Sequence, residues 1–184
     1  MSLSTNHNRL FALMGFVFIA ALSRLLPHPP NVSPIAAIAL FGGAGFVGKH
    51  WAFILPLLAM FISDIALEIT TGYGFHSLIP VVYAAFIITV GLGMLIRNRI
   101  TPMTVIASSL AASILFFALT NFAVWAQGGL YPQTFEGLLA CYVAAIPFFG
   151  NTLLGNLIYA GILFGAWAMM ENKFTVLARR QASL

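Results

Sequence analysis

Charged side chains are scarce in this chain. Only 7% of its 184 residues are charged and four are acidic, whereas 61% are hydrophobic; the mean hydropathy is +0.99. A soluble domain has about 25% charged residues, so this composition excludes a soluble globular protein and indicates an integral membrane protein. The net charge of +4 does not predict nucleic-acid binding, because the basic residues are scattered at the ends of apolar segments instead of forming a stripe.

Cysteine and catalytic motifs are also rare or absent. The single cysteine, Cys141, excludes an intramolecular disulfide and a zinc site built from several thiols. The sequence contains no HExxH, GxSxG or GxxxxGK[ST] motif. We therefore expect neither an enzyme nor ATP hydrolysis by this chain alone, and no cofactor or resident metal.

Long hydrophobic runs dominate the sequence and predict an all-α membrane protein, a single bundle of six transmembrane helices. The expected spans are about residues 10–26, 35–48, 51–70, 78–96, 101–127 and 138–170. Residues 35–48 would form a helix of about 21 Å, short of a hydrocarbon core of about 30 Å, so this span is predicted to be short or re-entrant. The last region is too long for one straight span, and we expect a break near Pro147.

The basic residues predict the orientation of the bundle. With six spans, Arg24 falls on one side of the membrane and seven basic residues fall on the other: Arg9, Lys49, Arg97, Arg99, Lys173, Arg179 and Arg180. By the positive-inside rule, both termini are predicted to be cytoplasmic.

Two acidic residues, Asp64 and Glu68, lie one helical turn apart in an apolar span, so they share a helix face. Carboxylates in a membrane segment are costly and usually face the bundle interior or a water-filled cavity. Arg24 lies on the same, outer side. It could neutralise one acid across two helices, it could line a binding site, or it could do both.

Other polar and aromatic residues gather at the outer helix ends and predict a cup that binds a small polar molecule. The candidate substrate-binding residues are Asp64, Glu68, Arg24, Asn31, Tyr73, His76, Asn121, Trp125 and Tyr131. As alternatives, Tyr73, Trp125 and Tyr131 fit an interfacial aromatic belt, and His76 fits a solvated loop.

These features together resemble the substrate-binding (S) components of energy-coupling factor vitamin transporters, which have six helices, cytoplasmic termini and an outer cup. Several motifs are closer still to an uncharacterised bacterial family of six-helix candidate transport proteins. They are Pro30-Asn31-Val32-Ser33-Pro34-Ile35, Ser63-Asp64, Thr120-Asn121-Phe122-Ala123-Val124-Trp125, and the series Tyr131-Pro132-Gln133-Thr134, Gly137-Leu138, Cys141-Tyr142 and Pro147-Phe148-Phe149.

The resemblance implies uptake of a vitamin-like molecule across the bacterial inner membrane. The implied partners are the substrate, the lipid bilayer and a transmembrane coupling protein with ATPase subunits. S components often carry AxxxA docking motifs on helices 1 and 3; here helix 3 offers only Ala59-x-x-x-Ser63, which departs from that pattern. Some similar proteins that transport cobalamin ligate cobalt through a cysteine. Cys141 is a candidate for that role, with a buried small hydrophobe as the alternative.

Two other functions remain open from the sequence. The chain could be a small accessory subunit of a larger membrane complex, in which case the acids are structural. It could also be a proton-coupled carrier in which Asp64 or Glu68 is the titrating group.

Overall fold

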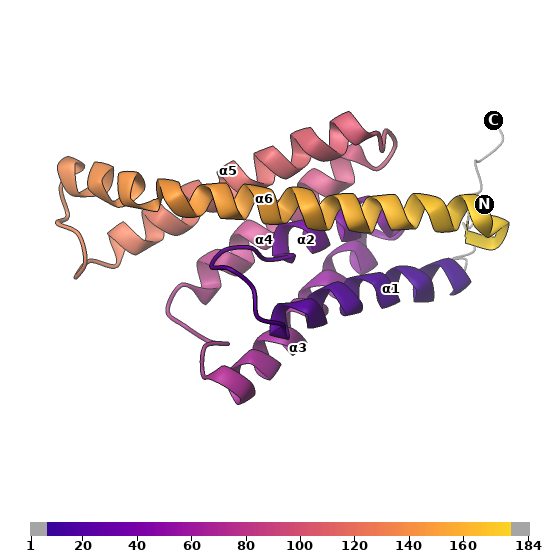
Figure 1. Cartoon of the computed structure of the whole chain (residues 1–184), viewed down its shortest axis with the longest axis horizontal. Coiled ribbons are helices and arrows are strands. Elements are labelled where there is room, and N and C mark those ends of the chain that lie inside the picture. The colour runs from indigo at the N-terminus through magenta and orange to yellow at the C-terminus, as the bar shows by residue number, and fades with distance from the viewer. Residues whose placement is uncertain (1–6, 178–184) are drawn as a thin grey trace.

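Six α-helices make up most of the computed structural model, which describes residues 7–177. They are α1 (His7–Leu22), α2 (Ile35–Gly45), α3 (Lys49–Thr71), α4 (Ile79–Ile96), α5 (Pro102–Ala126) and α6 (Phe135–Lys173), as Figure 1 shows. Short 3-10 helices follow α1 and α6 at Ser23–Leu25 and Thr175–Leu177. No strand occurs within residues 7–177.

Five helical segments are long and apolar enough to cross a membrane: His7–Leu25, Lys49–Thr71, Ile79–Ile96, Pro102–Ala126 and Phe135–Lys173. The chain is therefore a multi-pass membrane protein built as a helical bundle, and the predicted fold class is confirmed. The exception is α2, whose 11 residues give about 16 Å, roughly half of a hydrocarbon core. The expectation of a short second helix is thus correct.

The short helix α2 lies at the centre of the bundle. It contacts each of the other five helices, and all of its residues after Ile35 are buried. Two glycines bring it against α4: a Cβ on Gly43 would overlap the backbone at Val90, and a Cβ on Gly93 would overlap the backbone at Leu40. Small residues of this kind let helix backbones approach closely in a membrane, where packing drives association.

The longest helix, α6, runs without interruption for 39 residues, or about 58 Å. The break predicted near Pro147 is therefore wrong, because Pro147 lies inside the continuous helix. A proline removes one backbone hydrogen bond, and a membrane helix tolerates that loss where neighbouring groups compensate. Because its length exceeds the hydrocarbon thickness, α6 must tilt or extend beyond the bilayer.

The two ends of the bundle differ in charge. We call one the basic end: it holds the start of α1, the α2–α3 and α4–α5 connections and the end of α6 (Figure 1). Its basic residues are Arg9, Lys49, Arg97, Arg99 and Lys173. The opposite end holds the α1–α2 connector and the α3–α4 and α5–α6 loops, and its charged residues are Arg24, Asp64, Glu68 and Glu136. Arg179 and Arg180 lie outside the described residues.

Side chains tie the helices together at the basic end. Arg9 pairs with Glu171, donates to the Leu177 carbonyl and lies 5.0 Å from the Trp167 ring centroid. Arg97 donates to the carbonyl oxygens of Gly43, at 2.9 Å, and Val47, at 3.0 Å. The Arg9 contacts thus join α1 to α6 and the segment after it, and the Arg97 bonds join the end of α4 to the end of α2.

Candidate functional site

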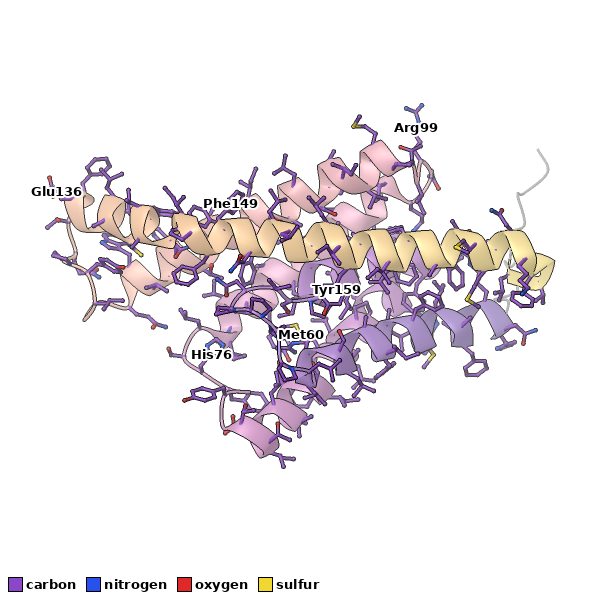
Figure 2. The ribbon with its side chains drawn as sticks, viewed as in Figure 1. Met60, His76, Arg99, Glu136, Phe149 and Tyr159 are labelled. Carbon is purple, nitrogen blue, oxygen red and sulfur yellow. The ribbon has the colours of Figure 1, made fainter. Side chains whose placement is uncertain are left out.

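A cavity of about 320 Å³ lies at the end of the bundle opposite the basic end. Its lining includes Ile35, the first residue of α2. Because α2 is central and begins there, the cavity occupies the part of the bundle centre that this short helix leaves unfilled. The walls come from α3, α4, α5 and α6, from the α1–α2 connector and from the α3–α4 loop. Figure 2 labels three lining residues, Met60, His76 and Phe149.

Six of the nine predicted substrate-binding residues line this cavity: Arg24, Asn31, Asp64, Tyr73, His76 and Asn121. The other three, Glu68, Trp125 and Tyr131, are not among the described residues around it. The fold therefore brings together most of the polar outer residues from segments far apart in the sequence. That they bind substrate stays a prediction.

A buried ion pair forms one wall of the cavity. Arg24 Nη1 lies 2.6 Å from Asp64 Oδ1 and also donates to Ser63 Oγ at 2.5 Å. The other carboxylate oxygen, Oδ2, accepts a hydrogen bond of 2.7 Å from the Tyr83 hydroxyl. The Asp64 side chain is 0% exposed, and a buried charge is tolerated only when it is paired and hydrogen-bonded. The expected neutralisation of Asp64 by Arg24 is therefore present, and Arg24 also lines the cavity; that it takes part in a binding site stays a prediction.

Glu68 has a different role from its neighbour one turn earlier. Its carboxylate accepts hydrogen bonds of 3.0 Å from the backbone N–H groups of Gly74 and Phe75. The loop packs closely here, because a Cβ on Gly74 would overlap the Asp64 carbonyl. Glu68 therefore positions the loop that carries Tyr73 and His76 to the cavity.

Trp125 lies in the last turn of α5 and Tyr131 in the α5–α6 loop, which extends beyond the other helices in Figure 1. Trp125 Nε1 donates to the Pro132 carbonyl at 2.9 Å, and its own carbonyl accepts a bond from Gln133 Nε2. These bonds hold the loop, which lies away from the cavity.

Cys141 is buried at the contact between α5 and α6, with its thiol 3.4 Å from the Asn121 carbonyl. It is not among the described lining residues. Within residues 7–177, no group of three or more histidine, cysteine or acidic residues is placed to hold a metal. This environment fits the alternative reading of Cys141, a small buried side chain.

The aromatic wall of the cavity was not predicted from the sequence. Four phenylalanines in two pairs, one pair on α5 and one on α6, line it: Phe116, Phe117, Phe148 and Phe149. The Phe117 ring lies 5.2 Å from the Phe149 ring. Helical spacing could have predicted the α5 pair from the sequence. Phe116 and Phe117 precede Thr120 and Asn121 by one helical turn and therefore share their helix face.

The comparisons with known proteins identify a family. A family model described as a family of unknown function, DUF6580, matches residues 4–178. Neither a curated protein nor a solved structure matches the chain. The resemblance to S components therefore stays a prediction. Because the match covers nearly the whole sequence, the chain belongs to the DUF6580 family.

Proposed function

We propose that the protein is a substrate-binding transport protein of the bacterial inner membrane. It would take up a small vitamin-like molecule from the outer side, as S components do. The cavity is the observation that supports this proposal, because polar and aromatic residues from five segments, namely α3, α5, α6, the α1–α2 connector and the α3–α4 loop, converge on it. In a membrane bundle, polar groups facing such a space are typical of a substrate site.

The size of the cavity limits the substrate. Its volume of about 320 Å³ equals that of roughly ten water molecules in the liquid and lies near the lower end for ligand pockets. A molecule of one or two rings would fit this space. A corrin would not, so cobalamin is not the substrate that we propose.

The bonds at the basic end bear on how transport would proceed. The cavity lies at the opposite end, and the contacts of Arg9 and Arg97 hold the basic end closed. By the charge distribution, this closed end faces the cytoplasm. Release inside would therefore require a second conformation in which these contacts separate, and the substrate would shift the population between the two states by its differential affinity.

Ligand binding can be tested with the purified protein in mild detergent. We would measure its melting temperature with a panel of vitamins and nucleobase derivatives, because a ligand that binds the folded state raises it. The matched variants are Ala145→Phe and Ala144→Phe. Ala145 lines the cavity, whereas the adjacent Ala144 is exposed on another face of α6.

At least one compound should stabilise the native protein and the Ala144→Phe variant. Ala145→Phe should lose this stabilisation, because its ring fills part of the cavity. Accumulation of the same compound in proteoliposomes would then test transport. If no compound stabilises the protein and a stoichiometric membrane partner copurifies with it, the accessory-subunit alternative replaces this proposal.

A further inference from the structure

The charged groups around the cavity balance each other. Among the described lining residues the charged side chains are Arg24 and Asp64, which form an ion pair. His76 also lines the cavity, and its Nδ1 accepts a hydrogen bond of 3.3 Å from the Leu78 N–H. With Nδ1 as the acceptor, the N–H group of this ring is at Nε2. The lining in this arrangement carries no net charge.

This balance disfavours a charged ligand of either sign. A cation finds no free carboxylate, because the Asp64 side chain is 0% exposed and both of its oxygens already accept bonds. An anion would have to share Arg24 with Asp64, which would leave one cation between two anions. An unmatched charge inside a bundle is costly, so the charge count favours a neutral ligand.

The remaining polar groups indicate what such a ligand must offer. Arg24 bonds to the described residues through Nη1, so its Nε and Nη2 groups are donors without a partner there. His76 presents Nε2–H as a further donor. Asn121 donates through Nδ2 to the Phe117 carbonyl at 2.8 Å, which leaves its side-chain oxygen as an acceptor. The complementary ligand has an acceptor oxygen and an N–H or O–H donor.

The apolar part of the lining indicates the shape of the rest of the molecule. The α5 and α6 phenylalanines form an aromatic surface at the cavity, in which the Phe117 ring also lies 5.5 Å from the Tyr142 ring. Aromatic side chains pack favourably against a planar ring by offset or edge contacts.

We infer that the cavity takes an uncharged, planar ring compound that carries a carbonyl-type oxygen and an N–H or O–H group, such as a ring amide. This inference rests on the proposed function and narrows its substrate. The carbonyl oxygen accepts from Arg24, the donor group bonds to Asn121, and the ring packs on the phenylalanines.

Matched sets of small probes test the charge preference. One set is nicotinamide, nicotinate and 1-methylnicotinamide; the other is benzamide, benzoate and benzamidine. Each set varies the charge on a similar ring. We would record the melting temperature with each probe at about 10 mM. A Kd near 1 mM predicts a rise of roughly 3–6 °C for the neutral members, with clearly smaller rises for the charged members.

Two variants test the residues. Arg24→Lys keeps a cation beside Asp64 but removes the Nε and Nη2 donors, and Asn121→Ala removes the acceptor. Each should weaken binding of the neutral probes by about tenfold, the effect of one lost hydrogen bond of about 1.4 kcal/mol. Arg99→Lys and Asn98→Ala, both exposed near the basic end, are the controls and should bind normally.

The possible failures separate the two proposals. Stabilisation by a charged member equal to or greater than its neutral partner overturns the charge inference, and so does the absence of a rise with all six probes. In either case the proposed function still stands if a compound of the wider panel binds in a manner that Ala145→Phe abolishes. Normal binding by both Arg24→Lys and Asn121→Ala overturns the assigned contacts.

Discussion

Asp64 is the residue whose replacement should most damage the bundle. The change Asp64→Asn keeps the shape of the side chain but removes the charge that balances Arg24. Breaking a buried pair by removing one partner costs about 3–5 kcal/mol. The Arg24 side chain is 12% exposed and lines a cavity, so partial solvation lowers the expected cost to about 2–4 kcal/mol.

The melting temperature makes this loss measurable. For a chain of this size, a loss of about 2–4 kcal/mol lowers it by roughly 5–15 °C, which tryptophan fluorescence in mild detergent can follow, because the chain has three tryptophans. Tyr83→Phe removes one hydrogen bond to the same carboxylate and should cost less, about 1–2 kcal/mol.

A double-mutant cycle isolates the pair itself. Arg24→Gln should also be destabilising, but the Arg24→Gln/Asp64→Asn double variant should lose less than the sum of the single losses, by about 1–3 kcal/mol. Strict additivity of the two changes would refute the ion pair as the reason why Asp64 is tolerated. So would an Asp64→Asn variant as stable as the native protein.

Two further replacements probe the surroundings of the cavity. Glu68→Gln should lower the free energy of unfolding by only about 0.5–1.5 kcal/mol, because the bonds of Glu68 hold an exposed loop. The variant should nevertheless be cleaved faster by a protease within residues 72–78. An unchanged cleavage rate would contradict the role of Glu68 in holding the loop. Gly93→Ala should destabilise by about 1–3 kcal/mol through overlap with α2. The control Gly91→Ala, two residues away, places its Cβ within 4 Å of no described atom and should be neutral or slightly stabilising. Both variants would be compared by thermal unfolding. Equal effects of Gly93→Ala and Gly91→Ala would argue against the close α2–α4 contact.

The helices could be predicted from the sequence because their signal is local. Hydrophobic runs and basic residues at their ends define the spans, and the length of residues 35–48 already indicated that α2 is short. The error at Pro147 has a tertiary cause. Whether a proline breaks a membrane helix depends on what surrounds the lost hydrogen bond, and the sequence of the helix alone does not contain that information.

The candidate site could be predicted only in part, for a similar reason. Polar residues stand out in an apolar sequence, and the cost of exposing them to lipid places them inside the bundle; Asp64 and Asn121 were found in this way. The same cost also predicts Glu68 and Trp125 at the site, because the sequence does not reveal which polar side chains bond to a nearby loop backbone. The phenylalanines were missed because they differ little from the apolar residues around them.

The short central helix also has a consequence for biosynthesis. A segment of 11 residues is too short to be held in a bilayer by its own hydrophobicity, and its ends would leave backbone groups facing lipid. Four of the five helices that contact it, α3, α4, α5 and α6, are translated after it. We therefore expect the second helix of the chain to be among the last to reach its final position, once the emerging C-terminal hairpin has closed around it.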